Sequence, residues 1–341
     1  MKTICYYSSS WFENIGNAFI DIGSMLSLSK ALDENINEYR LIQTSMFPCL
    51  NYSYSTSLKI PFRLFWRLYG EKLGLTFLER KINNLKSCTN FNLATHIKPN
   101  VIVISGCVLT TFYFRIFGNI LKRLKNKGAK FIFYGCGGNT YSNAEIENVS
   151  RWLDVLQPYA IITRENLAYK NYKSFAEKSF NGIDCGFFVG ELPLKGIEID
   201  LSPYIVSIFD KFKNKKLEEK LLKNFSRHYN IVKASHVPHA EKTIFPVPKK
   251  DPQITLVSEN PYDYLILYAN AEKVYSDRIH ACVASLAFGV PCRLYSDSPR
   301  IEIFSKFGIN ANEEVTLPKE TLRFWLVKQQ EFLSNILNEL L

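Results

Sequence analysis

The fold class is decided by residues 273–294, which read KVYSDRIHACVASLAFGVPCRL. A short β-rich run, Lys273 to Ser276, is followed directly by an alanine-rich run suited to a helix. Gly289 and Pro291 end that helix before the next apolar run begins. Short buried strands joined by helices are typical of parallel α/β sheets, so this stretch predicts a strand–helix–strand unit.

The same alternation of apolar runs and amphipathic stretches extends over the rest of the chain. Further strands are expected at Lys2 to Tyr7, Val101 to Gly106, Lys130 to Gly135, Tyr159 to Arg164, Tyr204 to Phe209, Tyr229 to Ala234, Ile254 to Ser258 and Cys292 to Tyr295. A length of 341 residues exceeds one ordinary core, and a stretch with several Pro and Gly residues follows Gly186. We therefore predict a Rossmann-like domain over 1–185, a second one over 186–318, and a closing amphipathic helix over 319–341. Two α/β domains with a cleft between them have an architecture like that of the GT-B glycosyltransferases.

Composition sets limits on the class of protein. The chain is 47% hydrophobic and 22% charged, which fits a folded globular protein and excludes disorder, collagen and coiled coil. Apolar runs end well short of the ~18 residues that a bilayer span needs, so we expect no transmembrane helix and no signal peptide. Eight cysteines contain no CxxC pair, which favours a reducing compartment with neither zinc nor disulfides.

Net charge points to anionic partners. With 42 Lys plus Arg against 32 Asp plus Glu, the formal charge is +10, which suits phosphates, nucleic acid or lipid headgroups. No known nucleic-acid-binding motif accompanies the charge, so we expect no nucleic acid partner. Between Lys59 and Lys86, basic residues alternate with aromatic ones, as in a peripheral membrane surface. An ordinary amphipathic helix with a solvated lysine face explains that segment equally well.

Arg278 and His280 are the first candidates for catalytic or ligand-binding residues, because they lie at the junction between a predicted strand and the helix that follows it. Free amides and the positive dipole end of such a helix favour a phosphate or carboxylate, and an arginine can clamp it with two hydrogen bonds. The histidine can take or give a proton near neutral pH. The alternative is structural, with Arg278 paired to Asp277 and His280 as an ordinary junction residue.

Two weaker signals accompany this junction. His236 and His239 could suggest a metal, but Pro238 between them favours an extended loop and no ligand cluster accompanies them. We expect His236 either to line the same cleft or to lie on a surface loop. The glycine-rich run Gly135 to Asn139 lacks the spacing of a dinucleotide or P-loop motif, so it either lets backbone approach a ligand or permits a tight turn.

The block from Asp277 to Pro291, with the following run to Phe304, resembles the carboxyl-terminal signature of the polysaccharide pyruvyl transferase family. Three shorter matches follow the family's order. Asn14 to Asn17 resembles its Asn-x-Gly-Asp motif, Thr163 to Tyr169 its Arg-Asp/Glu-x-x-Ser segment, and Ile183 to Phe188 the segment that closes its first domain.

The chain departs from the family's pattern at three places. Asn17 replaces an acidic residue, Ala168 replaces a serine, and the run Ser105 to Cys107 stands where the family has several glycines. These changes leave the expected fold unaltered but loosen the substrate assignment.

The resemblance implies transfer of a pyruvyl group from phosphoenolpyruvate to two hydroxyls of a sugar, with formation of a cyclic ketal and release of phosphate. The acceptor would belong to a surface polysaccharide or its lipid-linked precursor. Phosphoenolpyruvate is then a co-substrate, and no cofactor or metal is expected. Its carboxylate and phosphate call for at least two cationic groups. The expected site residues are His280 and Arg278 for catalysis, Arg164, Arg278, Arg300 and His236 for the donor, and Asn14, Gly16 and Asn17 for the acceptor.

For several of these residues an explanation without a ligand is also open. Arg164 could be a buried structural partner of Glu165 or Asp184, and Arg300 could lie on the surface. The implied activity places the protein in the cytoplasm, with peripheral contact at the inner face of the membrane as one option. Two other functions stay open: a GT-B-type glycosyltransferase that uses a nucleotide sugar, and a binding protein that keeps the scaffold without turnover.

Overall fold

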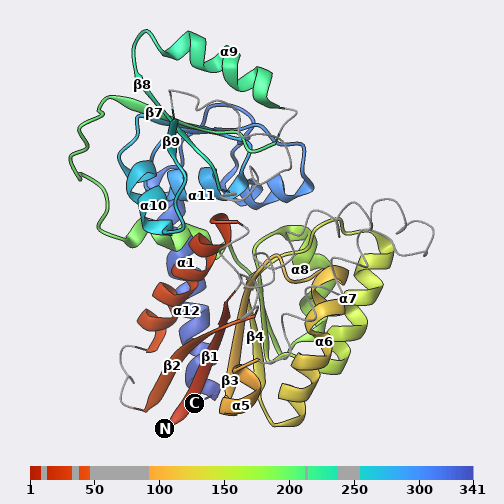
Figure 1. Ribbon diagram of the computed structural model, residues 1–341. Helices are drawn as coiled ribbons and strands as arrows, with labels where there is room; N and C mark the ends of the chain where they lie inside the picture. The colour runs from red at the N-terminus through yellow and green to blue at the C-terminus, as the bar shows by residue number, and fades with distance from the viewer. Residues whose placement is uncertain (9–13, 33–37, 47–91, 212–213, 237–253, 341) are drawn as a thin grey trace, which may run out of the picture.

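A computed structural model describes residues 1–8, 14–32, 38–46, 92–211, 214–236 and 254–340 (Figure 1). It divides into two α/β lobes. The first is built on a six-stranded sheet in the order β2-β1-β3-β4-β5-β6, in which every pairing is parallel. Its strands are β1 (Lys2–Ser8), β2 (Tyr39–Ser45), β3 (Val101–Gly106), β4 (Lys130–Cys136), β5 (Ala160–Thr163) and β6 (Lys178–Asn181).

Helices cover both faces of this first sheet. Successive side chains of a strand point to opposite faces, so each strand packs against helices on both sides. Ile4 and Tyr6 of β1 pack with α1 (Gly16–Leu32) and α12 (Lys319–Leu340), whereas Cys5 and Tyr7 pack with α6 (Thr111–Asn126) and α7 (Asn143–Leu156). The shorter helices α5 (Ala94–Ile97) and α8 (Asn166–Tyr172) and the 3₁₀ turn η2 (Lys173–Phe175) complete the lobe. The expected closing helix thus forms, and it packs on the first sheet.

The second lobe is built on a five-stranded parallel sheet in the order β11-β10-β7-β8-β9. Its strands are β7 (Tyr204–Ile208), β8 (Asn230–Ala234), β9 (Ile254–Leu256), β10 (Lys273–Ser276) and β11 (Cys292–Leu294). Its helical segments are α9 (Lys215–Phe225), α10 (Pro261–Ala269), α11 (Ile279–Ala287) and the 3₁₀ segment η5 (Pro299–Phe307).

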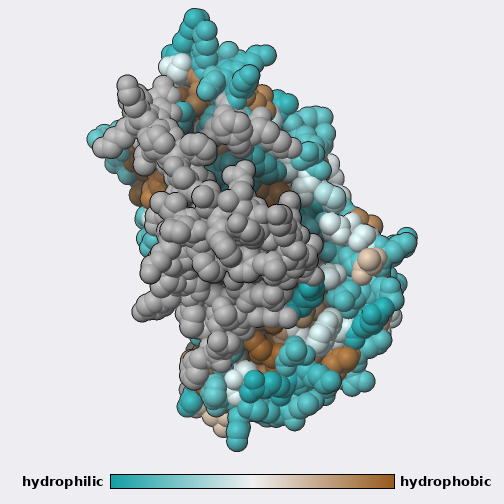
Figure 2. All heavy atoms as spheres, turned by 45° about the vertical axis from the view of Figure 1, so that its right-hand side comes forward, coloured by the Kyte–Doolittle hydropathy of each residue, from teal (hydrophilic) through white to brown (hydrophobic). Residues whose placement is uncertain are grey.

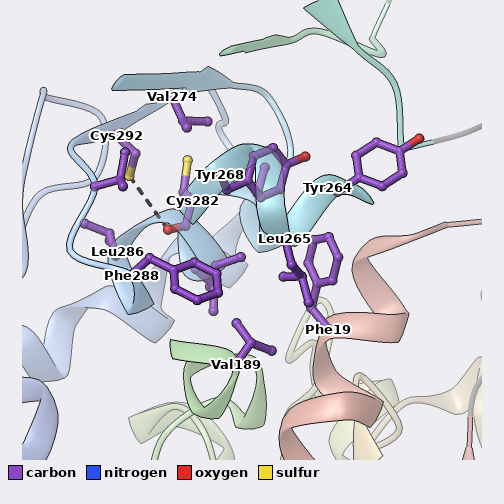
Figure 3. Close-up of a cluster of buried hydrophobic side chains, with 14 of the residues drawn as sticks. Phe19, Val189, Tyr264, Leu265, Tyr268, Val274, Cys282, Leu286, Phe288 and Cys292 are labelled. Atoms are coloured by element: carbon purple, nitrogen blue, oxygen red, sulfur yellow. Dashed lines mark hydrogen bonds between the residues drawn. The ribbon is translucent and has the colours of Figure 1, made fainter. Parts of the chain in front are cut away.

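The two lobes share one hydrophobic core, so they are packed together at their junction. Figure 3 shows Phe19 of α1 beside Leu265 of α10, and Val189 of the 3₁₀ segment η3 (Cys185–Glu191) beside Phe288, the residue that follows α11. A glycine allows this approach, because a Cβ on Gly190 of η3 would lie 2.3 Å from the carbonyl oxygen of Ala287 of α11. The carboxyl ends of strands from both sheets, where α/β proteins carry their sites, face this junction (Figure 1).

On the face drawn in Figure 2, the described atoms are mostly hydrophilic, with apolar patches between them. Large apolar residues exposed elsewhere on the described residues include Phe324 and Val327 of α12 and Val257. No helix in the described ranges is both long and apolar enough to cross a membrane. The basic segment from Lys59 to Lys86 lies outside the described residues.

Candidate functional site

The stretch that decides the fold also builds the first part of the site. Arg278 is the N-cap residue of α11, directly after β10, and its backbone N–H donates to Ser276 Oγ at 2.8 Å. His280 therefore lies in the first turn of the helix. The helix ends at Phe288, and Gly289 takes the left-handed conformation (φ +74°) that favours glycine. The predicted strand-to-helix junction is confirmed.

His280 lies at the contact of the two lobes and is only 4% exposed. On one side it meets the start of α1, where a Cβ on Gly16 would lie 3.1 Å from His280 Cβ. On the other side its Nε2 is 3.5 Å from Asp184 Oδ2. Burial lowers the pKa of His280; Asp184 opposes that shift, and the nearby charges of Arg300 and Arg164 add to it. The imidazole is therefore neutral at neutral pH, and it can accept a proton.

A buried ion-pair cluster from the first lobe faces this imidazole. Arg164 follows β5, is 1% exposed, and places Nη1 2.8 Å from Asp184 Oδ2 and Nε 3.4 Å from Glu165 Oε2. Burial alone would raise the pKa of Asp184, but the proximity of His280 and the charge of Arg164 outweigh it and hold that pKa well below its usual range. Arg164 is thus the buried partner of both acids, as the structural alternative predicts.

Arg278 is held by an acid that the sequence analysis missed. Its Nε donates to Asp210 Oδ2 at 2.6 Å, whereas Asp277 Oδ1 is 4.0 Å away. The Arg278 side chain keeps 25% of its surface exposed, while that of Asp210 keeps 4%. Asp277 in turn accepts hydrogen bonds from the backbone N–H groups of Asp210 and Lys211, at 3.2 and 2.9 Å, and so fixes the loop after β7. The one sequence feature that points to Asp210 as a site residue is its position just beyond the end of a strand.

His236 lies in the core, and the surface-loop alternative is wrong. Its side chain is 0% exposed, Nε2 lies 2.6 Å from the Tyr268 hydroxyl, and Phe19 packs edge-on against the ring. Burial lowers the pKa of His236 to about 3, so the ring is neutral at neutral pH. A neutral, fully buried ring offers no positive charge to an anionic donor, and the expected part of His236 in donor binding stays a prediction. Its backbone instead holds the site together, because its N–H donates to Asp210 and its carbonyl accepts from Ile15.

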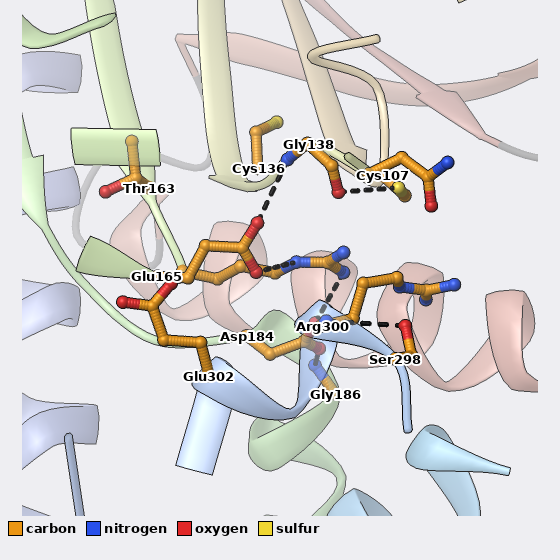
Figure 4. Close-up of polar contacts among 12 residues, drawn as sticks. Cys107, Cys136, Gly138, Thr163, Glu165, Asp184, Gly186, Ser298, Arg300 and Glu302 are labelled. Carbon is orange, nitrogen blue, oxygen red and sulfur yellow. Dashed lines mark hydrogen bonds and ion pairs between the residues drawn. The ribbon is translucent and has the colours of Figure 1, made fainter. Parts of the chain in front are cut away.

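Segment η5 brings Arg300 and Glu302 to the same place (Figure 4). The Arg300 guanidinium makes no ion pair with any described residue, although its backbone N–H donates to Ser298 Oγ at 3.4 Å. Four buried side-chain atoms of this cluster make no hydrogen bond with a described residue: Arg164 Nη2, His280 Nε2, Arg300 Nε and Glu302 Oε2. Arg164 Nε and Glu165 Oε2 make no hydrogen bond either, but they face each other as an ion pair at 3.4 Å. Buried polar atoms are normally satisfied, so such a concentration indicates a ligand site.

Small residues surround the cluster. A Cβ on Gly137 would lie 2.4 Å from Glu165 Oε1 and 2.6 Å from Arg164 Nε, so this position in the glycine-rich run is needed for close approach. Asn14 Oδ1 accepts a hydrogen bond from the backbone N–H of Gly16 at 3.1 Å, which shapes the start of α1, and Asn17 follows in its first turn.

The described residues contain no group of three His, Cys, Asp or Glu side chains placed to hold a metal ion.

Solved structures with a similar fold are sugar-nucleotide enzymes. The UDP-GlcNAc 2-epimerase of Methanocaldococcus jannaschii, solved with UDP-GlcNAc and UDP, is 16% identical with a TM-score of 0.55 over 99% of each chain. The UDP-GlcNAc 2-epimerase of Neisseria meningitidis, bound to UDP-GlcNAc, is 13% identical with a TM-score of 0.55 over 98% of this chain and 94% of that one. At this identity the likeness shows the fold alone, and that fold is the expected GT-B-like pair of α/β lobes.

Sequence comparison identifies the family of the chain. No curated protein sequence matches the chain significantly. A family model for polysaccharide pyruvyl transferase matches residues 14–299, a range that runs from the start of α1 through Arg164, Asp184, Arg278 and His280 to the beginning of η5. Since this match covers most of the chain and every part of the site except Arg300 and Glu302 at its edge, the chain belongs to the polysaccharide pyruvyl transferase family.

Proposed function

We propose that the protein transfers a pyruvyl group from phosphoenolpyruvate to two hydroxyls of a sugar and so forms a cyclic ketal. One observation carries the proposal. His280 of the second lobe lies 3.5 Å from Asp184 of the first, in a buried cluster where Arg164 Nη2 and Arg300 Nε find no partner among the described residues. A proton-transfer group and anion-binding groups from both lobes thus meet at one place.

The donor would be bound by three arginines. Guanidinium groups match the planar carboxylate and the phosphate of phosphoenolpyruvate. Asp210 occupies Nε of Arg278 and leaves the rest of that guanidinium available, while Arg164 Nη2 and Arg300 Nε have no partner among the described residues. In this proposal His236 supports donor binding through Asp210 and makes no contact with the donor itself.

The reaction balances with donor and acceptor alone. The methylene carbon of phosphoenolpyruvate gains one proton and becomes a methyl group, which makes the neighbouring carbon electrophilic. Two sugar oxygens form bonds to that carbon, each losing a proton, while the bond to the phosphate oxygen breaks. One of the two protons thus ends on the methyl group and the other on phosphate. A neutral His280 can take a hydroxyl proton and pass it on, and Arg278 can stabilise the leaving phosphate.

The acceptor side would be formed by Asn14, Gly16 and Asn17 at the start of α1, because a Cβ added to Gly16 would lie only 3.1 Å from His280 Cβ. A sugar of a surface polysaccharide or of its lipid-linked precursor is the acceptor that the family suggests. We place the enzyme in the cytoplasm, where it would meet a lipid-linked acceptor at the inner face of the membrane.

Thermal stabilisation tests the donor. Phosphoenolpyruvate at one hundred times its Kd should stabilise the protein by about 2.7 kcal/mol, while UDP-sugars should not. His280→Ala should keep this stabilisation and lose at least 10³-fold in ketal formation, whereas the exposed His228→Ala should retain both. Stabilisation by UDP-GlcNAc in place of phosphoenolpyruvate would favour a nucleotide-sugar enzyme and contradict the proposal.

A further inference from the structure

Two carboxylate oxygens in the cluster lack the hydrogen donors that buried carboxylates normally have. Glu165 is 1% exposed, and its Oε1 accepts hydrogen bonds from Gly138 N at 3.0 Å and from the Tyr141 hydroxyl. Its Oε2 has only the 3.4 Å ion pair with Arg164. Glu302 Oε2 is buried as well, and no described residue donates to it. Both acids therefore have acceptor capacity left for a ligand.

The two acids lie in one electrostatic environment. Burial raises the pKa of Glu302, the backbone of Leu167 opposes that shift, and the charge of Glu165 adds to it. Figure 4 shows Glu302 on η5 beside Glu165, while the side chain of Arg300 from the same segment points away from both. The cation whose charge acts on both acids is Lys306. The first lobe supplies Glu165 and the second supplies Glu302, so a ligand that satisfied both would bridge the lobes.

Phosphoenolpyruvate cannot be that ligand. At neutral pH it carries no hydrogen on oxygen, so it has nothing to donate to a carboxylate. A sugar hydroxyl suits the place better, because it donates to a carboxylate, accepts from a guanidinium and adds no charge.

We propose that Glu165 and Glu302 bind hydroxyl groups of the acceptor sugar, across the junction from the start of α1. This inference rests on the proposed function, and it gives the acceptor an anchor in both lobes. Arg278, the start of α11 and the guanidinium groups of Arg164 and Arg300 are then left to the donor, with His280 between the donor and the sugar. The competing explanation is structural: Glu165 and Glu302 share one proton and satisfy each other.

Saturation-transfer NMR distinguishes the two explanations. The probes are methyl α-D-galacto-, manno- and glucopyranoside, which together present cis-2,3, cis-3,4 and 4,6 hydroxyl pairs, each measured with and without phosphoenolpyruvate. We expect the wild type to bind at least one of them and Glu302→Ala to bind it at least tenfold more weakly. The exposed Glu198→Ala is the control and should bind as the wild type does.

Glu302→Gln separates hydroxyl binding from proton sharing. A glutamine amide can donate to Glu165 as a protonated acid would, so the structural explanation predicts wild-type sugar binding, whereas hydroxyl binding by the carboxylate predicts a several-fold loss. No sugar signal from the wild type, or equal signals from the wild type and both Glu302 variants, would overturn the inference. Phosphoenolpyruvate binding is measured on the same samples, and its absence would count against the proposed function while leaving the sugar result to be judged by itself.

Discussion

Asp210 Oδ2 accepts hydrogen bonds from Arg278 Nε at 2.6 Å and from the backbone N–H of His236 at 3.1 Å. Its other oxygen accepts from the Ser235 hydroxyl at 2.6 Å. This single buried carboxylate therefore joins the ends of β7 and β8 to the start of α11. Since Nε of Arg278 is occupied, the orientation of the guanidinium is fixed before any ligand arrives, and preorganisation of this kind lowers the entropy cost of binding.

Substitution of Asp210 tests that orientation. Asp210→Ala removes the acceptors and should raise the Kd for phosphoenolpyruvate about tenfold, or about 1.4 kcal/mol, measured by titration calorimetry. Asp210→Asn can keep one oxygen on Arg278 and let its amide donate to Ser235, so its Kd should stay within about threefold of the wild type. If the alanine variant bound phosphoenolpyruvate as tightly as the wild type, Asp210 would have no positioning role.

The buried His236 predicts how stability depends on pH. Its pKa is about 3 in the folded protein against 6.5 for an ordinary histidine, so below pH 6.5 the unfolded chain binds a proton that the folded chain does not. Stability from this group is therefore complete above pH 6.5 and is lost as the pH falls. Between pH 7 and pH 5 the free energy of unfolding should fall by about 2 kcal/mol on its account.

Urea unfolding at several pH values measures this effect. In His236→Gln, where the amide can still reach Tyr268, the loss between pH 7 and pH 5 should be smaller than in the wild type by about that amount. His280 also has a lowered pKa and contributes to the slope in the same direction, so the comparison with the wild type, and not the slope alone, isolates His236. Identical pH slopes for the two proteins would contradict the assignment.

The sequence predicts the interior of the fold better than its edges. Strands β3 and β4 are buried on both faces and read as continuous apolar runs, which makes them recognisable. Strands β2 and β6 were missed because each lies at an edge of the first sheet and mixes polar with apolar residues. These two strands form because they pair with a neighbouring strand, and their own sequences carry no pattern that predicts a strand.

For the site, the sequence predicts which residues gather but only part of how their charges are balanced. Arg164, Arg278, Arg300 and His280 follow strand ends or helix starts, so topology alone brings them together. Asp184, 20 residues from Arg164, is among the expected partners of that arginine, whereas Asp210, 68 residues from Arg278, is not. The pairing of Arg278 with Asp210 depends on β7 and β10 lying side by side in the second sheet, which a single sequence does not display.

The last helix fixes the segment that carries Asp184. Gln329 of α12 is fully buried, and its Oε1 accepts a hydrogen bond from the backbone N–H of Ile183 at 2.6 Å. Gly182 allows this contact, because a Cβ there would lie 2.1 Å from the same oxygen. Gln329→Leu would leave the Ile183 N–H buried without an acceptor, and it should lower the free energy of unfolding by about 2 kcal/mol in urea titrations. The neighbouring Lys328→Ala, on an exposed part of the helix, should change it by less than about 0.5 kcal/mol. If Gln329→Leu were as stable as Lys328→Ala, the hydrogen bond to Ile183 would not be what holds α12 to this segment.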